Sequence, residues 1–385
     1  MAEAPGRDYA FLYAPPWNGP TRFSKHHLAS YLAARGNRVL FSEAPLTPLA
    51  ARRGAQFMRE LRRTLSPPRQ VEPNLWVTRH FLPLPYHSAT RLTSTRAANR
   101  IGQRWLAPRL RSDLARLNFS MPTVVAGLPH VVDALPYLHW RTLVYHCADD
   151  YSHVRGFPNT LACLEEELCR RADLVVTTSE TLCEERRRFN SHTYWIPNGV
   201  DVEHFGAPVE PAAELRPVPR PIIGFIGGLS QWVDTELIAA MAHARPEWSI
   251  VLIGPVGVDV SALRGLSNVH LLGARPYAQA PAYLTAMDVA LIPFRREPVT
   301  YHADPIKAYE YLAAGVPVVA TDLPSLRRFS HLIALADSTT DVVDEVERAI
   351  DAGRESGRIA RQREGMRHSW RSRFEEWERL LACAS

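Results

Sequence analysis

Short apolar runs alternate with longer segments of helical periodicity along the whole chain. This alternation is typical of α/β proteins, in which parallel strands are joined by crossover helices. Gly36 and Asn37 mark the end of a predicted helix at Ser24–Ala34. In the first half of the chain we predict strands at Tyr9–Ala14, Arg38–Ser42, Leu75–Thr78, Thr123–Ala126, Leu143–Cys147, Leu174–Thr177 and Thr193–Ile196.

A second series of strands begins at Ile222, directly after a segment with five prolines at 206–221. Such a proline-rich segment is typical of a stiff linker, and 385 residues are more than one ordinary core holds. The strands predicted beyond the linker are Ser249–Ile253, Val269–Leu272, Val289–Ile292, Val318–Ala320 and Ile333–Ala336.

The end of the chain has apolar residues at helical spacing, among them Trp370, Phe374 and Trp377. This pattern predicts one amphipathic helix over Met366–Ala384. The predicted organisation is therefore a first domain at 1–205, a linker at 206–221, a second domain at 222–365 and a terminal helical segment at 366–385.

The net charge of +5 comes almost wholly from arginine, because Lys25 and Lys307 are the only lysines of the sequence. A lysine ammonium is a compact point charge, whereas a guanidinium is a planar fork, so the two lysines are candidates for special roles. No apolar run approaches the ~20 residues that cross a bilayer, and we expect no signal peptide. Five cysteines without a Cys-x-x-Cys pair indicate reduced thiols and a cytoplasmic location.

Residues 50–120 contain fourteen arginines and three acidic residues. Such a basic face is suited to an anionic lipid carrier, a membrane surface or a phosphorylated acceptor, and a solvated face is the alternative. We therefore expect peripheral contact with the inner face of the membrane. No module of aromatic and basic residues indicates nucleic-acid binding.

The most informative stretch is 301–325, which contains a predicted helix between Pro305 and Gly315 followed by a buried strand. A helix N-terminus at the edge of a parallel sheet is suited to bind an anion. Lys307 lies in the first turn of this helix and Glu310 one turn later on the same side. Together they offer a cation for phosphate and a carboxylate for ribose hydroxyls.

This stretch resembles the nucleotide-sugar signature of GT-B glycosyltransferases, in particular the retaining, family-4-like (group 1) type. Further matching segments are Ala172-Asp-Leu-Val-Val-Thr-Thr-Ser-Glu, Ile196-Pro-Asn-Gly-Val-Asp-Val-Glu-His-Phe and Ala286-Met-Asp-Val-Ala-Leu-Ile-Pro-Phe. The resemblance implies a GT-B fold of the α/β class, with two facing Rossmann-like domains and a cleft between them. It also implies a final helix that returns to the first domain.

The donor site implied by the resemblance lies in the second domain. Glu310 matches the ribose-binding second glutamate of the family's Glu-x7-Glu motif, but His302 stands where the first glutamate is expected. His302 or Asp304 is then expected to contact the transferred sugar. The Arg and Lys that hold the diphosphate in the family are missing beyond the glycine loop, which places more weight on Lys307 and on Arg295 or Arg296. The other predicted donor-binding residues are Gly227, Gly228, Ser230, Pro255, Arg275, Tyr277 and Ile306.

The first domain is expected to bind the acceptor. The loop with Asn18 and Gly19 precedes the helix that carries His26, and Gly19 is also placed near the donor diphosphate. His130 is the leading catalytic candidate by resemblance, beside Lys307, and an ordinary loop histidine is the alternative. Asp149 and Asp150 are expected to orient acceptor hydroxyls or to cap the next helix.

The predicted function is the transfer of a sugar from a nucleoside-diphosphate sugar to an acceptor, with retention and without a metal or other cofactor. The acceptor is a sugar, a lipid-linked molecule or a small molecule, and nucleic acid is excluded as a partner. The Asp-Asp pair is not the Asp-x-Asp metal motif, and no His, Cys or Glu cluster has metal-ligand spacing. A sugar-nucleotide 2-epimerase and a non-catalytic nucleotide-binding module of the same fold are the alternatives.

Overall fold

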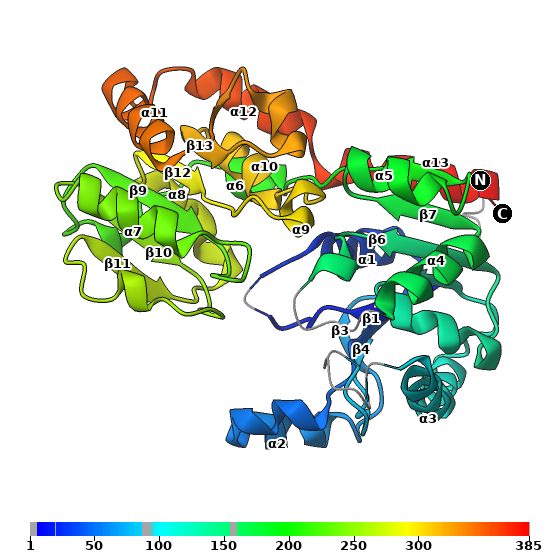
Figure 1. Cartoon of the computed structure of the whole chain (residues 1–385). Helices are drawn as coiled ribbons and strands as arrows, with labels where there is room; N and C mark the ends of the chain where they lie inside the picture. Colours follow the sequence, from blue (N-terminus) through cyan, green and yellow to red (C-terminus); the bar gives the residue numbers. More distant parts are fainter. Residues whose placement is uncertain (1–5, 20, 87–92, 94, 155–159, 385) are drawn as a thin grey trace. The chain divides into compact units, whose positions relative to one another are not determined.

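The computed structural model describes residues 6–19, 21–86, 93, 95–154 and 160–384. The chain divides into two compact units (Figure 1). The first unit contains Met1–Gly19, Phe23–Ile196 and Phe374–Ser385, and the second contains Pro20–Arg22 and Pro197–Arg373. This division falls at Ile196, ahead of the proline-rich segment 206–221.

The described residues of the first unit form an eight-stranded sheet in the order β3-β4-β2-β1-β5-β6-β7-β8 (Figure 1). All neighbouring strands are parallel except the β3–β4 pair. The central strands are buried along their whole length because helices cover both faces of such a sheet. The strands are β1 (Asp8–Ala14), β2 (Arg38–Glu43), β3 (Arg69–Glu72), β4 (Leu75–Thr78), β5 (Thr123–Ala126), β6 (Thr142–Cys147), β7 (Leu174–Thr177) and β8 (Thr193–Trp195).

The helices of this unit connect and flank these strands. They are α1 (Ser24–Ala34), α2 (Ala55–Arg63), α3 (Arg96–Arg116), α4 (Leu161–Arg171) and α5 (Glu180–Arg187), with α13 (Trp370–Ala384) from the end of the chain. From Phe374 onward α13 groups with the first unit. There the Tyr31 ring lies 5.3 Å from the Phe374 ring, and the Tyr31 hydroxyl donates to Glu378.

The described part of the second unit contains a six-stranded parallel sheet in the order β11-β10-β9-β12-β13-β14. This is the strand order of a Rossmann-like domain, which turns back at its first strand. The strands are β9 (Ile222–Ile226), β10 (Ser249–Ile253), β11 (Val269–Gly273), β12 (Val289–Ile292), β13 (Val318–Thr321) and β14 (Ile333–Ala336). The helices are α6 (Val202–Gly206), α7 (Thr235–Ala244), α8 (Ala280–Ala286), α9 (Pro298–Tyr301), α10 (Ile306–Ala313), α11 (Thr339–Ala352) and α12 (Arg358–Arg367).

Every strand predicted from the apolar runs is present, and its ends agree within one residue. The predicted helix Ser24–Ala34 has the same bounds as α1. Strand β3 was not predicted because its residues Arg69–Glu72 are mostly polar. It pairs antiparallel with β4 at the edge of the sheet, where little apolar surface has to be buried.

The prediction of one helix over Met366–Ala384 is wrong, because α12 ends at Arg367 and α13 begins at Trp370. The chain between them pairs with Val200 instead. The Val200 N–H donates to the His368 carbonyl over 2.9 Å, and the Trp370 N–H donates to the Val200 carbonyl over 3.0 Å. Tertiary hydrogen bonds thus interrupt a sequence whose local pattern is helical throughout.

None of the helices in the described part of the chain combines the length and the apolar character needed to span a bilayer.

Candidate functional site: a nucleotide pocket in the second unit

The second sheet reverses its strand order between β9 and β12. In open α/β sheets, ligands bind at the carboxyl ends of the strands beside such a reversal. β9 and β12 pair only through their first residues, at Ile223 and Gly224, so they separate toward their carboxyl ends. The Tyr311 hydroxyl occupies this gap and accepts a hydrogen bond from the Ile226 N–H over 3.0 Å.

Two glycines let the loops after β9 and β10 approach each other closely. Gly254 has φ +152°, and a Cβ there would lie 1.9 Å from the Gly227 carbonyl oxygen. The Gly227 N–H donates to the Ile253 carbonyl over 2.8 Å. Only glycine fits at position 254, because any side chain would overlap the neighbouring backbone. Gly254 was not among the predicted site residues, although a glycine directly after an apolar strand is a signal for such an approach.

Helix α10 brings the two predicted charged residues to the same loop. Lys307 Nζ lies 2.7 Å from Glu310 Oε2. The Lys307 Cε is 3.3 Å from the position that a Cβ of Gly227 would take, so its stem passes beside the glycine loop. Glu310 is only 4% exposed. The structure therefore places a buried carboxylate and a cation together at the carboxyl edge of the sheet.

These groups line a pocket of about 500 Å³, counted with its space open to solvent. Its lining combines backbone at the strand ends with apolar and aromatic side chains. Burial and the nearby Glu310 raise the pKa of the Tyr277 hydroxyl. The residues that line the pocket include Ile226, Gly227, Gly254, Pro255, Arg275, Tyr277, Ala280, Lys307 and Glu310.

The predicted donor residues are thus brought together in part. Gly227, Pro255, Arg275, Tyr277, Lys307 and Glu310 line the pocket. Gly228 and Ser230 lie in the adjoining loop, where the Ser230 hydroxyl donates to the Gly228 carbonyl over 3.3 Å. Ile306 is the half-buried first residue of α10. The lining residues that sequence reasoning missed include Arg22, Ile226, Ile253, Gly254, Ala280 and Tyr283.

Asp304 has a different environment from the one expected of a sugar contact. It is 5% exposed, and its carboxylate accepts from the Asn198 N–H and from the Tyr309 hydroxyl, each over 2.7 Å. It also forms an ion pair with Arg328. These three partners occupy both oxygens, so the structure gives Asp304 the geometry of a residue that fixes the start of α10.

His302 lies at the end of the short helix α9, outside the pocket lining. Its Nδ1 is 2.8 Å from the Pro298 carbonyl oxygen, and this contact fixes the orientation of the imidazole ring. The expected contact of His302 with the transferred sugar stays a prediction.

Arg275 was expected to stack on a base through its guanidinium plane. The structure instead holds this guanidinium in an ion pair with Glu214, with Nη2 and Oε1 2.5 Å apart, and against the Tyr283 hydroxyl over 3.0 Å. Its Nη1 also donates to the Leu272 carbonyl. Arg275 lines the pocket while its guanidinium is paired with Glu214, a residue of the segment predicted as a linker.

Two further cations considered for the diphosphate also have protein partners. Arg295 lies 3.7 Å from Asp234 and 3.4 Å from Glu236. Arg296 pairs with Asp337. The start of α7 is capped, because the Asp234 carboxylate accepts from two of its N–H groups. Lys307 lines the pocket together with Arg22 and Arg275. Helix α10 begins at Ile306, and its N-cap residue Pro305 provides no side-chain cap.

The predicted residues of the first unit lie at the carboxyl edge of its own sheet, with different degrees of exposure. Asn18 is exposed, and Gly19 closes a turn by donating to the Pro16 carbonyl. His26 is fully buried: its Nδ1 accepts from the Phe23 N–H over 3.0 Å, and its Nε2 lies 3.1 Å from the Pro16 carbonyl oxygen. Both imidazole nitrogens therefore hold the loop before α1, and the expected acceptor contact has no free ring nitrogen.

His130 lies in a 3-10 turn after β5 and is 2% exposed. Its ring stacks on Tyr13 with 5.9 Å between centroids, and its Nε2 is 3.0 Å from the Tyr86 carbonyl oxygen. His130 also lines a small cavity with Asn99 and Leu164. The side chain is thus tightly packed, and its catalytic role stays a prediction.

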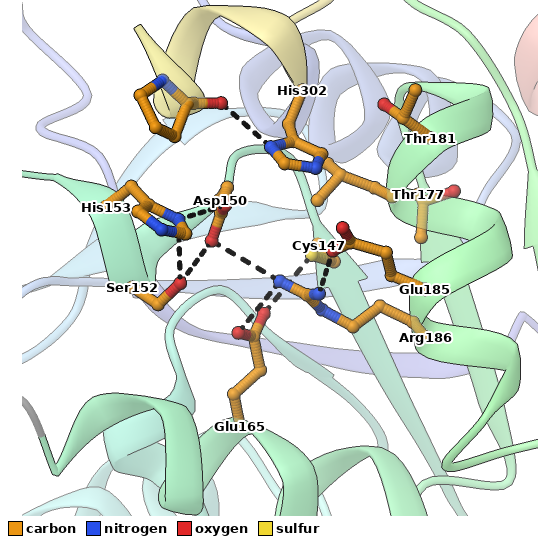
Figure 2. A network of polar contacts seen from close by, with 12 residues as sticks. Cys147, Asp150, Ser152, His153, Glu165, Thr177, Thr181, Glu185, Arg186 and His302 are labelled. Carbon is orange, nitrogen blue, oxygen red and sulfur yellow. Dashed lines mark hydrogen bonds and ion pairs between the residues drawn. The ribbon is translucent and has the colours of Figure 1, made fainter.

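Asp149 and Asp150 differ although they are neighbours. Asp149 is exposed, whereas Asp150 is 1% exposed and belongs to a polar network with the buried Arg186 and the exposed Ser152 and His153 (Figure 2). The Asp150 carboxylate accepts from the Ser152 hydroxyl and lies 2.5 Å from His153 Nδ1. The Arg186 guanidinium, in turn, lies 3.0 Å from Glu165. This network fixes the chain after β6. Asp149 is exposed as a residue, but desolvation raises the pKa of its carboxyl and the nearby Lys25 lowers it.

No group of three or more His, Cys, Asp or Glu side chains within the described ranges is arranged as a metal site.

Part of the second unit is similar to a known protein family. Residues 220–351 match the family model described as "Glycosyl transferases group 1". This range contains the sheet, the glycine loop and the Lys307–Glu310 pair. Over these residues the chain is similar to the group 1 glycosyltransferases. The predicted resemblance to this group is thereby confirmed, whereas the retaining subtype stays a prediction.

Two curated relatives are similar to part of the chain. The putative teichuronic acid biosynthesis glycosyltransferase TuaH of Bacillus subtilis (strain 168) is 30% identical over 207 residues, which cover 48% of this chain and 52% of TuaH. The lipopolysaccharide core biosynthesis mannosyltransferase LpsB of Rhizobium meliloti (strain 1021) is 26% identical, covering 48% of this chain and 55% of LpsB. The chain spans about half the length of the curated relatives it matches.

Solved structures resemble the chain over nearly its whole length. Sucrose-phosphate synthase from Thermosynechococcus elongatus has a TM-score of 0.72 at 18% identity and covers 98% of this chain and 100% of its own. Anabaena HepE in complex with UDP has a TM-score of 0.67 at 15% identity, with coverage of 98% and 100%. These likenesses show the fold, so the predicted GT-B class with its two Rossmann-like sheets is confirmed.

Proposed function

We propose that the chain transfers a sugar from a nucleoside-diphosphate sugar to an acceptor, with retention of the anomeric configuration and without a metal ion. The observation that carries this proposal is the Lys307–Glu310 pair in the pocket at the carboxyl edge of the second sheet. The match of residues 220–351 to the group 1 glycosyltransferases supports it. So does the fold shared with a protein solved in complex with UDP.

Glu310 and Lys307 divide the recognition of the donor between them. Glu310 accepts hydrogen bonds from ribose hydroxyls, because an ionised carboxylate offers only acceptors. Lys307 has three N–H donors, so it retains Glu310 and still donates to a phosphate oxygen. The backbone N–H groups at the uncapped start of α10 add further donors to the same anion.

The chemical step places negative charge on the departing diphosphate. Lys307 and the start of α10 stabilise that charge where it develops, which is the largest catalytic effect such a site supplies. With retention, the acceptor attacks from the face of the leaving group, and a diphosphate oxygen takes its proton. No protein base is needed for this route, in agreement with the enclosed position of His130.

The nucleobase lies against Pro255 and Tyr277 in this proposal. Both residues line the pocket beside the buried carboxylate. The Tyr277 ring is held from behind by His204, whose ring stacks on it at 4.9 Å between centroids. Proline and tyrosine faces accept any base, so the pocket supports a nucleotide and leaves the base identity to experiment.

The first unit is proposed to bind the acceptor, with Asn18 and Asp149 as its exposed polar contacts. It is also proposed to contact anionic lipid through α2, none of whose residues is buried. Arg59, Arg62 and Met58 are exposed on this helix, and Leu65 directly after it is 86% exposed. Basic and apolar side chains on one exposed helix suit the interface of an anionic membrane.

The experiment that tests the function is a nucleotide screen on the full chain. UDP, GDP, dTDP and ADP are each added in excess, and the midpoint of thermal unfolding is measured, because a ligand of the folded state raises it. We expect one of the four to raise the midpoint and its sugar conjugate to be consumed only when an acceptor is present. No stabilisation by any nucleotide contradicts the proposal. Consumption of the donor without an acceptor supports the epimerase alternative.

A further inference from the structure

The described residues that line the pocket of the second unit include three cations, Arg22, Arg275 and Lys307. Lys307 lies 2.7 Å from Glu310. The Arg275 guanidinium pairs with Glu214, with 2.5 Å between Nη2 and Oε1. Each of these two pairs is neutral as a whole. Arg22 therefore supplies the positive charge that the described lining has beyond its two ion pairs.

Arg22 comes from a distant part of the sequence. The short segment Pro20–Arg22 groups with the second unit, although the residues before and after it group with the first. Thr21 lines the same pocket, and the other described residues of the lining lie between Ile226 and Glu310. The half-buried Arg22 is thus part of the pocket through the tertiary fold.

The backbone on both sides of Arg22 is held by one buried side chain, that of His26. The His26 Nδ1 accepts from the N–H of Phe23, the residue directly after Arg22, over 3.0 Å. The His26 Nε2 lies 3.1 Å from the Pro16 carbonyl oxygen, which also accepts from the Gly19 N–H over 3.2 Å. A side chain on a backbone that is already fixed loses less freedom when it binds a ligand.

Arg22 acts electrostatically at the same end of the pocket as Glu310. Burial raises the pKa of the Tyr277 hydroxyl, and the carboxylates of Glu310 and Asp201 raise it further. Arg22 lowers the same pKa, so its charge and the Glu310 carboxylate lie near one hydroxyl. In the proposed function Glu310 binds the ribose, to which the phosphates of a nucleotide are joined. A phosphate beside this carboxylate is repelled unless a cation is near.

We propose that Arg22 binds a phosphate of the donor and is the second cation of the donor site, beside Lys307. This inference deepens the proposed function and rests on it for the identity of the ligand. A nucleoside-diphosphate sugar has a negative charge on each phosphate, and more charge develops on the diphosphate when the sugar leaves. A guanidinium donates two parallel hydrogen bonds to phosphate oxygens, which a lysine ammonium cannot do. Arg22 thus adds both charge and orientation to the site.

The test compares ligands that differ in their phosphates. They are the nucleoside diphosphate identified among UDP, GDP, dTDP and ADP, its monophosphate and its nucleoside, and calorimetry on the full chain measures their affinities. Arg22→Gln removes the charge, and Arg22→Lys keeps the charge without the planar fork. The matched control Arg363→Gln removes the same charge from an exposed arginine outside the described lining. Thermal unfolding without ligand checks that each variant is folded.

We expect Arg22→Gln to bind the diphosphate about tenfold more weakly or worse, the effect of one lost charged hydrogen bond. Arg22→Lys should be intermediate, and Arg363→Gln should bind like the wild type. The affinity for the nucleoside should not change, because it has no phosphate. Wild-type affinity of Arg22→Gln for the diphosphate overturns the inference. An equal loss for the nucleoside also overturns it, because that loss would reflect the shape of the pocket.

The monophosphate identifies the phosphate that Arg22 contacts. If Arg22→Gln weakens the monophosphate as much as the diphosphate, the contact is to the phosphate next to the ribose. If it weakens only the diphosphate, the contact is to the terminal phosphate. Both results support the inference.

Inorganic pyrophosphate separates a failure of this inference from a failure of the proposed function. If none of the four nucleotides binds, the proposed function is contradicted, and pyrophosphate takes their place as the ligand. Binding that is about tenfold weaker in Arg22→Gln than in Arg363→Gln then still supports a diphosphate site at Arg22. Equal binding to the two variants, or no binding to the wild type up to about 10 mM, overturns the inference as well.

Discussion

Lys307 and Glu310 are one helical turn apart on α10, and their charged atoms are 2.7 Å from each other. The pair is largely enclosed: the side chain of Lys307 is 17% exposed and that of Glu310 is 5% exposed. Removing one partner of such a pair leaves the other as a buried charge. Each residue therefore has a role in ligand binding and a role in holding its partner, and the variants have to separate the two.

Glu310→Gln keeps the size of the side chain and removes its charge, whereas Glu310→Ala removes both. We expect Glu310→Ala to weaken nucleotide binding severely, by about 100-fold, and Glu310→Gln to weaken it less, because hydrogen bonds to a charged acceptor are the stronger ones. Calorimetry with the nucleotide found in the screen measures both. Circular dichroism checks that the fold is intact. Unchanged affinity in Glu310→Ala would refute the ribose role.

Lys307→Ala tests the stabilisation of the leaving group. We expect turnover to fall roughly 100-fold, as when one charge-stabilising donor is lost. The measurement is the release of nucleoside diphosphate at saturating donor and acceptor. Lys307→Arg is the matched control, since it keeps the charge but not the compact geometry, and it should retain an intermediate rate. Near-normal turnover in Lys307→Ala would mean that other groups stabilise the diphosphate.

The sequence predicts those parts of the fold that depend on local patterns of apolar and polar residues. Buried parallel strands such as Ser249–Ile253 are continuous apolar runs, and the ends of such strands locate the loops that meet at one edge. The meeting of Gly227 with Lys307 follows from this reasoning. Position 254 could have been included, because glycine follows the strand there directly.

Contacts between distant segments could not be predicted from one sequence. Asp304 binds Asn198, which is 106 residues away, and Arg275 binds Glu214 at a separation of 61. Each partner gives the side chain a structural contact, and the ligand contacts expected of Asp304 and Arg275 stay predictions. The burial of Lys25 was equally hidden, because a lysine in the first turn of a helix has no local feature that distinguishes an enclosed side chain from a solvated one.

Gly254→Ala tests the close approach of the two loops that form the pocket. The added Cβ would meet the Gly227 carbonyl oxygen at 1.9 Å, so we expect a loss of more than about 3 kcal/mol of stability and loss of nucleotide binding. Gly265→Ala is the matched control, since Gly265 has φ +89° and nothing within 4 Å of its Cβ position. It should carry only the backbone strain, about 1–3 kcal/mol. Equal midpoints of thermal unfolding for the two variants would contradict this account.

The exposed helix α2 is tested with Arg59→Ser, Arg62→Ser and Arg63→Ser combined. We expect cosedimentation with phosphatidylglycerol vesicles to weaken by about 100-fold, at about 1 kcal/mol for each basic residue near an anionic surface. The control combines Arg363→Ser, Arg367→Ser and Arg371→Ser, three exposed arginines of the second unit, with the same change in net charge. If both triple variants lose binding equally, the effect is one of net charge and α2 is not the contact.

Lys25 also predicts a pH dependence of stability. Its pKa is lowered from 10.5 to about 8 by burial, so the unfolded chain binds more protons than the folded chain between these two values. Stability therefore rises with pH in this window, and below about pH 8 the buried charge costs about 3 kcal/mol.

In phosphate-free buffer at pH 7, Lys25→Met should be more stable than the wild type. The difference should shrink as the pH rises from about 8 to 10.5, because the wild-type lysine then loses its proton in the folded state. Denaturant unfolding of both proteins at several pH values measures it. Lys25 also lowers the pKa values of His146 and Asp149, so the comparison includes the response of these two neighbours. A difference that stays constant across the window would show that the Lys25 ammonium is better solvated than its burial indicates.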